Sequence, residues 1–265
     1  MKKEIQINTC LGPVNATITE ICDSLPVLYL HGVFLDKSLW DGITPEIPGH
    51  TAICIDMPNH GSNGPVGFDW SLADCVKMVA EVITGLGHKK VVGIGHSWGS
   101  MVLLRAVAHY PQLFAALGMM NMPVDPPRLQ TLLTLKLIKS LSGFKRVFGR
   151  AIANRLYSKG YLKMHPEAVT SIQQNMLKRS NIEIQQVIDA VMIHADDGRP
   201  YLDRLRVPAL AAIGVDDSVK KPGNLETHVL PGGHVSPHEA PLETIRFVRE
   251  ILKLTGSGIS SRSGT

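Results

Sequence analysis

The chain has 265 residues, of which 44% are hydrophobic and 19% are charged, and its formal net charge is +4. These values are typical of a folded globular protein and exclude a disordered or collagen-like chain. No stretch approaches the roughly 20 apolar residues that a membrane-spanning helix needs, so we expect no integral membrane association. The length suits one α/β domain with an insertion.

The N-terminal stretch MKKEIQINTC has polar residues where a secretory signal would need an unbroken apolar run. The four cysteines show neither CxxC nor metal-ligand spacing. We therefore expect reduced thiols, no metal site and a cytoplasmic location.

Short runs rich in Val and Ile, each bounded by turn residues, predict β-strands. They lie at 14–20, 26–30, 51–55, 90–95, 117–122, 208–214 and 227–230. Helical patterns separate several of these runs. Ser71 and Asp74 form a capping box ahead of 72–87, and another helix is predicted at 99–110, before Pro111. The alternation predicts an α/β fold, a mostly parallel doubly wound sheet covered on both faces.

The alternation stops at 122–205, where no strand pattern appears. Four amphipathic stretches follow one another, and the first has leucines at 129, 133, 137 and 141. We expect their apolar faces to pack on one another or to roof a pocket. The sequence thus predicts an all-helical insertion, residues 122–205, in a core formed by 1–121 and 206–254, with a disordered Gly/Ser-rich tail at 255–265.

The helical insertion is also the basic part of the chain, with 13 Lys and Arg against 7 Asp and Glu. A nucleic-acid site would combine a basic stripe with aromatic residues, but aromatic residues are only 5% of this chain. We therefore expect solvated helix surfaces and no nucleic-acid partner. Attraction of anionic substrates or lipid head groups is the alternative.

Residues 91–100 read VVGIGHSWGS, an apolar strand that runs through a tight turn into a helix. This is the G-x-S-x-G pattern of a nucleophile elbow, in the strand–turn–helix context that it requires. Strand and helix pass closely at such a turn, and Gly95 and Gly99 supply the small residues needed there. Ser97 is therefore the predicted nucleophile.

A serine nucleophile also needs hydrogen-bond donors aimed at the developing negative charge. The Trp98 backbone N–H, at the start of the helix, is one candidate. The second is the Val33 N–H, because Gly32 lets the backbone turn in closely after the strand VLYL. His31 is expected to be structural.

Three motifs together resemble the α/β-hydrolase superfamily over about residues 10–253: HGVFLDKSLW, DMPNHGSN and GHSWGS. The resemblance implies that the helical insertion is the family's cap, between core strands six and seven. DMPNHGSN departs from the family's D-x-x-G-x-G-x-S turn, with Asn59 at a glycine position. We assign Asp56 and His60 to the scaffold.

The resemblance also implies the order serine, acid, histidine, with the histidine in a pattern like G-H-x-x-x-x-E-x-P. Gly233-His234 stands five residues before Glu239, so His234 is the predicted base. His238 is then a surface or helix-capping residue. His228 is expected to pack on the sheet or face solvent.

The family's acid usually lies three residues beyond the glycine that ends its strand, which here gives Asp217. The following link, 218–226, reaches at most about 30 Å against a strand of roughly 15 to 20 Å. An extended or single-turn return therefore fits, and a crossover helix does not. Asp125, which follows the predicted strand at 117–122, a position that some members of the family use for the acid, remains the alternative.

With a serine in the elbow, the resemblance implies acyl transfer through a seryl acyl-enzyme. The leading interpretation is hydrolysis of a carboxylic ester, with a small to medium acyl group or a hydrophobic ester. No metal or organic cofactor is implied. Thioester, lactone, amide or carbon–carbon hydrolysis would use the same residues. A small-molecule sensor with slow turnover and a mobile four-helix cap is the alternative class. The sequence does not determine the oligomeric state.

Overall fold

The computed structural model describes residues 2–19 and 22–256. Across those residues an eight-stranded sheet runs in the order β1-β2-β4-β3-β5-β6-β7-β8. The strands are β1 (Lys3–Thr9), β2 (Gly12–Ile18), β3 (Val27–Leu30), β4 (Ala52–Ile55), β5 (Val91–His96), β6 (Phe114–Met120), β7 (Ala209–Gly214) and β8 (Thr227–Leu230). Strand β2 is antiparallel to β1 and β4, and all pairs from β4 to β8 are parallel. The predicted fold class is confirmed. The predicted disordered tail lies, from residue 257 on, outside the described residues.

Strand β1 was not among the predicted strands. It is a polar edge strand in which Ile7 alone is buried, so its sequence lacks a clear apolar run. A tight hairpin with β2 aligns it, from Lys3 opposite Ile18 to Thr9 opposite Gly12. Pairing with a neighbour, rather than burial, therefore explains this strand.

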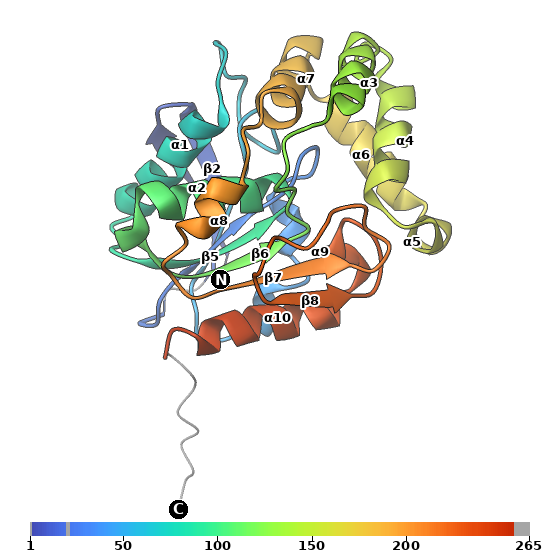
Figure 1. Cartoon of the computed structure of the whole chain (residues 1–265). Coiled ribbons are helices and arrows are strands. Elements are labelled where there is room, and N and C mark those ends of the chain that lie inside the picture. The colour runs from blue at the N-terminus through green and yellow to red at the C-terminus, as the bar shows by residue number, and fades with distance from the viewer. Residues whose placement is uncertain (1, 20–21, 257–265) are drawn as a thin grey trace, which may run out of the picture.

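The centre of the sheet is covered on both faces (Figure 1). Helices α1 (Leu72–Gly85) and α2 (Trp98–His109) lie on one face, and α10 (Pro241–Lys253) lies on the other. All residues of β3, β4 and β5 are buried as a result. Helix α1 begins at the predicted capping box.

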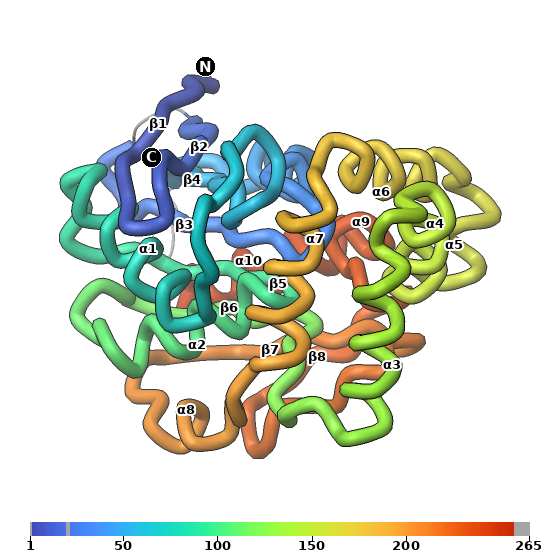
Figure 2. The backbone as a smooth tube through the Cα atoms, turned by 90° about the horizontal axis from the view of Figure 1, so that it is seen from above, coloured from blue at the N-terminus to red at the C-terminus, as the bar shows by residue number. Residues whose placement is uncertain are grey.

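The helical insertion contains six α-helices, all within the described residues, where four amphipathic stretches were predicted. They are α3 (Leu129–Ser140), α4 (Lys145–Leu156), α5 (Lys159–Met164), α6 (Glu167–Leu177), α7 (Asn181–Val187) and α8 (Arg199–Asp203). A π-helical segment, Ile188–Ile193, continues α7. The two additional helices, α5 and α8, bury none of their residues and are too short for a periodic pattern. Seen from above, α3 to α7 arch over the sheet (Figure 2).

The sequence predicted that the leucine stripe of α3 packs on other helices or roofs a pocket. In the structure this stripe does not pack inward. Leu129, Leu133 and Leu137 are 73%, 61% and 63% exposed, whereas Leu135 is buried. Val147 of the second stretch is also exposed. Helix α3 is apolar on two faces, and the face of Leu135 and the half-buried Ile138 packs toward the π-helical segment.

The link between β7 and β8 contains no helix along residues 215–226, all of which the structure describes. The two strands are nevertheless parallel, from Ala211 opposite Thr227 to Gly214 opposite Leu230. The extended return that the link length predicted is therefore correct. A single short helix, α9 (Ser236–Glu239), follows β8 and precedes α10.

Candidate active site

Ser97 lies in the turn between β5 and α2 with a positive φ of 50°. Such a backbone is strained for a residue with a side chain and is typical of functional positions. A Cβ at Gly95 would lie 2.5 Å from the Ser100 nitrogen, and one at Gly99 would lie 2.4 Å from the Leu30 carbonyl oxygen. The close crossing of strand and helix therefore requires both glycines.

Three side chains from separate loops meet at this turn. The His234 Nε2 atom lies 2.8 Å from the Ser97 Oγ atom, and His234 Nδ1 lies 2.8 Å from Asp217 Oδ2. A carboxylate only accepts hydrogen bonds, so Nδ1–H donates to Asp217 and Nε2 is left to accept from the serine hydroxyl. All three come from loops at the carboxyl ends of parallel strands, which share one edge of a sheet.

The Asp217 side chain is only 2% exposed. Burial alone would raise the pKa of this carboxyl, but hydrogen bonds from His234, Asn121 and the Val219 backbone hold its pKa below the usual value. Asp217 is therefore ionised at neutral pH and fixes the tautomer of His234.

The sequence pattern did not identify Asn121 as part of this centre. Its Nδ2 donates to Asp217 Oδ2 at 2.8 Å, and its Oδ1 accepts from the Ser236 hydroxyl at 2.8 Å. Asn121 has a φ of 51° and is fully buried at the end of β6. A polar residue directly after a buried strand is the signal that could have indicated it.

The junction of α4 and α5 holds the loop that carries His234. The His234 N–H donates to the Leu156 carbonyl at 3.0 Å, and the Ser158 N–H donates to Glu239 at 3.0 Å. The Tyr157 hydroxyl is hydrogen-bonded to His238 Nδ1 at 2.8 Å. The expectation of a surface or capping His238 was therefore wrong, because the helical insertion covers it.

Asp125 is not brought to His234. It lies exposed between β6 and α3, and within residues 2–19 and 22–256 its carboxylate has no hydrogen bond or ion pair. Asp216, the residue before Asp217, is exposed as well. His228 is half-buried on β8, with its ring against Phe247 and its Nε2 atom 3.4 Å from Glu250 Oε2.

The backbone N–H groups of Val33 and Trp98 flank the turn that carries Ser97. No hydrogen bond in the described part of the chain uses either of them as a donor. Gly32 precedes Val33, and a Cβ there would lie 2.6 Å from His96 Nδ1 and 3.2 Å from the Ser97 Cβ. The glycine therefore allows the loop after β3 to approach Ser97.

His96 separates Gly32 from the His234 loop. Its Nε2–H donates to the His234 carbonyl at 2.6 Å, and its buried Nδ1 has no partner among the described residues. Burial lowers the pKa of His96 to about 3, so the ring is neutral. It supports the carbonyl of the same residue whose side chain contacts Ser97.

The surroundings of the turn are aromatic and buried. The Trp98 ring stacks on Trp70 with centroids 5.7 Å apart and lies 5.3 Å from the ring of His60. Phe34 meets Phe148 of α4 edge-on at 5.8 Å. Core and helical insertion therefore share an apolar contact at Phe34, the residue after Val33.

The scaffold residues hold the loops around the site. His31 Nε2 accepts from the Met57 N–H, and His60 Nε2 accepts from the Phe34 N–H. The buried Asp56 binds Lys37 at 2.9 Å. Asn59 has a φ of 58°, a backbone that glycine favours and asparagine tolerates. This explains how asparagine can stand at the glycine position of the turn.

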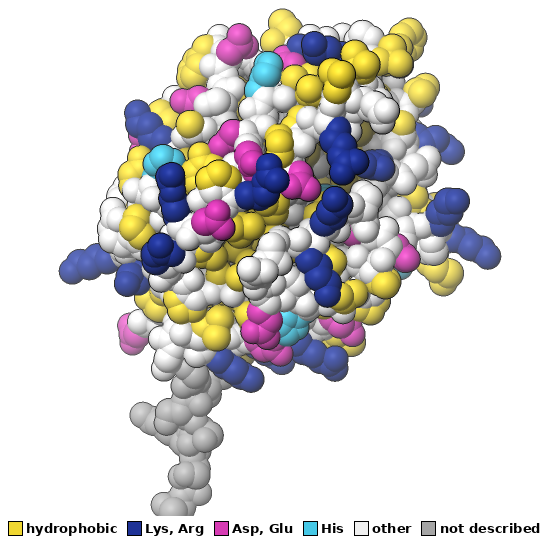
Figure 3. Space-filling view, in the orientation of Figure 1, with side chains coloured by type: hydrophobic (Ala, Val, Ile, Leu, Met, Phe, Trp, Pro, Cys, Tyr) yellow, Lys and Arg dark blue, Asp and Glu magenta, His cyan; other side chains and the backbone are white. Residues whose placement is uncertain are grey.

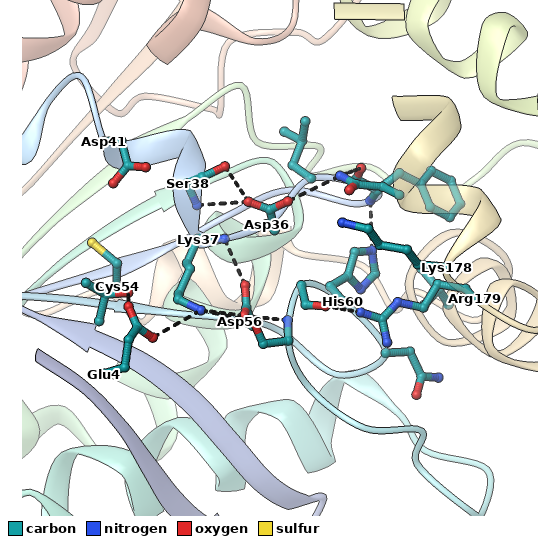
Figure 4. Close-up of a pocket in the computed structure, with 18 of the residues that line it drawn as sticks. Glu4, Asp36, Lys37, Ser38, Asp41, Cys54, Asp56, His60, Lys178 and Arg179 are labelled. Carbon is teal, nitrogen blue, oxygen red and sulfur yellow. Dashed lines mark hydrogen bonds and ion pairs between the residues drawn. The ribbon is translucent and has the colours of Figure 1, made fainter. Parts of the chain in front are cut away.

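A cavity of about 440 Å³ is lined by Phe34, His60 and Arg179 among other residues, and neither Ser97, Asp217 nor His234 lines it. Figure 4 shows Lys37 between Asp56 and Glu4, with Arg179 beside His60. Most of the charged side chains that line the cavity are paired within the protein, as Lys37 is with Asp56.

Neither a metal centre nor a membrane span is present in the part of the chain that the structure describes. No three His, Cys, Asp or Glu side chains there are grouped to hold a metal ion. None of the described helices combines the length and hydropathy needed to cross a bilayer.

A family model described as "Alpha/beta hydrolase family" matches residues 27–247. The chain belongs to the alpha/beta hydrolase family. Its curated relatives are distant. Protein NDRG1-B of Xenopus laevis is 25% identical over 193 residues, which are 68% of this chain and 48% of that protein. Lipase LipV of Mycobacterium tuberculosis is 29% identical over 95 residues, 36% of each chain. The matches span about half of these relatives or less.

Solved structures of the same fold include a thermophilic esterase from Thermogutta terrifontis, with a TM-score of 0.82 and 22% identity over 96% of this chain and 99% of that one. The enol-lactonase from Burkholderia xenovorans LB400 superposes with a TM-score of 0.84 and 15% identity over 94% of this chain and 100% of that one. At these identities the likeness supports the family's fold and not a particular substrate.

Proposed function

We propose that this protein is a serine hydrolase that cleaves carboxylic esters through a seryl acyl-enzyme. The observation that carries the proposal is the continuous hydrogen-bonded series from Ser97 through His234 to Asp217, with both contacts at 2.8 Å. A serine hydroxyl is a weak nucleophile at neutral pH, and such a series supplies the base that activates it.

In the proposed reaction the Ser97 oxygen attacks the ester carbonyl carbon while His234 Nε2 takes the hydroxyl proton. Asp217 stabilises the imidazolium that forms. The Val33 and Trp98 N–H groups donate to the oxyanion of the tetrahedral intermediate, since preorganised donors stabilise charge that appears only in the transition state. His234 then gives the proton to the departing alcohol.

The second half of the reaction removes the acyl group from Ser97. A water molecule loses a proton to His234 Nε2 and attacks the acyl carbon. Collapse of the second intermediate breaks the bond to Ser97, whose oxygen recovers the proton from His234. The free acid leaves, and no cofactor takes part in any step.

We also propose that the helical insertion, residues 122–205, acts as a cap over a core formed by 1–121 and 206–254. Its α4–α5 junction holds the His234 loop, and Phe148 of α4 meets Phe34 next to Val33. This apolar contact supports a small to medium acyl group or a hydrophobic ester as substrate.

The test is a series of p-nitrophenyl esters of increasing acyl length, assayed with wild type and Ser97→Ala. We expect multiple turnovers that fall by about 10⁴-fold or more in the variant. A fluorophosphonate should phosphonylate Ser97 with loss of fluoride, which adds the mass of the phosphonyl group to wild type and not to Ser97→Ala. Ser100→Ala is the matched control, because the Ser100 hydroxyl bonds the Met120 carbonyl instead of His234.

Two results would contradict the proposal. Retained turnover in Ser97→Ala would show that Ser97 is not the nucleophile. A single turnover, accompanied by a ligand-induced rise in the melting temperature, would favour a small-molecule sensor. Parallel assays with a thioester, a lactone and an amide would separate ester hydrolysis from the related reactions.

A further inference from the structure

The outer face of α3 and of the start of α4 exposes an unusual number of large apolar side chains. They are Leu129 at 73%, Leu133 at 61%, Leu137 at 63%, Leu141 at 47%, Phe144 at 68% and Val147 at 72% exposure. We call these six residues the α3–α4 face. Leu129, Leu133 and Leu137 stand at four-residue intervals on one side of α3, and Leu141, Phe144 and Val147 follow in the turn to α4 and at the start of that helix.

This face is not the packing face of the helix. Leu135, the buried residue of α3, lies on the opposite side, toward the π-helical segment. A helix that is apolar on two sides has a second surface to bury, since surface helices normally carry polar residues away from the core. Large exposed apolar patches mark sites of interaction with proteins or membranes.

The charge around the α3–α4 face is of one sign. Residues 126–166 contain nine Lys and Arg and no Asp or Glu. Lys136 lies within the leucine stripe, and Arg146 and Arg150 flank Val147, all three exposed. Figure 3 shows hydrophobic side chains together with Lys and Arg at the top of the molecule, where Figure 1 has α3.

The neighbouring acids do not cancel this charge. Asp189 of the π-helical segment is paired with Lys139, on the inner side of α3. Asp125 and Glu167 stand just outside the basic segment at its two ends. A second copy of the chain would bring like charges together if the two faces met, which disfavours self-association through this surface.

We propose that the α3–α4 face is a docking surface for an anionic lipid membrane, in the plane of its head groups. Apolar side chains with Lys and Arg among them are the combination that binds a membrane surface without crossing it, through apolar burial and attraction to anionic lipids. The inference concerns binding and does not depend on the chemistry proposed for Ser97.

The test is co-sedimentation of the full chain with vesicles made of equal parts of phosphatidylcholine and phosphatidylglycerol. Binding should be at least about tenfold weaker on pure phosphatidylcholine, and weaker at about 1 M salt, where the Debye length is only about 3 Å. Ser97→Ala should bind as wild type does, so a failure of the proposed hydrolysis leaves this result intact.

Two pairs of variants locate the surface. Leu133→Gln with Leu137→Gln should reduce vesicle binding by about tenfold or more, since burial of each side chain contributes. The matched control is Leu242→Gln on α10 with Leu254→Gln at the C-cap of that helix, residues that are 64% and 43% exposed. Lys136→Glu with Arg150→Glu should lose about fivefold per positive charge removed. Its control is Lys89→Glu with Lys90→Glu, in the exposed loop before β5.

The proposal is overturned if wild type does not bind the anionic vesicles, or if the α10 pair loses as much binding as the α3 pair. A third result would assign the face to a second copy of the chain. In that case wild type sediments as a dimer without vesicles, Leu133→Gln with Leu137→Gln abolishes the dimer, and no vesicle binding is seen. Circular dichroism of each variant confirms that the fold is retained, as expected for exposed positions.

Discussion

The central sheet and the helical insertion bury their apolar residues to different degrees. All residues of β3, β4 and β5 are buried, whereas α3 has one buried residue, Leu135, and α5 and α8 have none. Helices cover the sheet on both faces, so an apolar strand at its centre has only an interior environment. The helices of the insertion are covered on one side only. Apolar periodicity therefore identifies a helix face without indicating whether that face meets the core.

The largest expected difference between core and insertion concerns the acid. Asp217→Asn on the core loop should lower kcat by about 10⁴-fold, because an amide cannot hold the His234 tautomer that accepts from Ser97. Asp125→Asn, at the start of the insertion, should leave kcat unchanged. Ester turnover measured for both variants decides between them, and the reverse pattern would reassign the acid.

Replacing a glycine by alanine should change the free energy of unfolding differently in the core and in the helical insertion. A Cβ at Gly99 would lie 2.4 Å from the Leu30 carbonyl oxygen, so Gly99→Ala should cost about 3 kcal/mol of unfolding free energy. Nothing lies within 4 Å of a Cβ at Gly160 in α5, and Gly160→Ala should gain up to about 1 kcal/mol. Urea unfolding of both variants measures this, and equal changes would mean that the crossing of β5 and α2 is not tight.

Mild acid should lower the free energy of unfolding through buried histidines of the core rather than through the insertion. Burial lowers the pKa of His60 and His96 to about 3, and their usual value is 6.5. The folded pKa lies below the unfolded one, so this stability is complete above about pH 6.5 and is lost as the pH falls toward 3, by at most about 1.4 kcal/mol per pH unit for each ring.

Urea unfolding at pH 7, 6 and 5 should therefore give a falling free energy of unfolding. His60→Gln should make that slope shallower. The matched control is His165→Gln in the insertion, where the side chain is 47% exposed instead of buried. A slope that His60→Gln leaves unchanged would assign the acid sensitivity to other groups.

The smallest effect tests whether the insertion supports the core at all. Tyr157→Phe removes the hydrogen bond to His238 and should cost about 1 kcal/mol, seen as about a fivefold loss in kcat/KM. Tyr161→Phe is the control, because its hydroxyl has no hydrogen bond among the described residues. If both variants match wild type, the Tyr157 contact has no role in positioning the His234 loop.

Much of the site could be predicted because its residues lie next to strand ends. The elbow at Ser97, Gly32 before Val33, and Asp217 three residues after Gly214 each have a local pattern. Asn121 and Tyr157 have none. Asn121 contacts Asp217 across 96 residues of sequence, and Tyr157 contacts His238 across 81, so only the folded chain brings them together.

The sequence by itself indicated which strand ends carry the candidate site residues, because buried strands and tight turns are encoded by residues within a few positions of one another. It also determined that residues 122–205 are helical, since that periodicity is local. Only the tertiary structure decided which apolar face of α3 is covered and that Asn121 lies beside Asp217. Burial and distance depend on what other elements pack nearby, and no single segment of sequence contains that information.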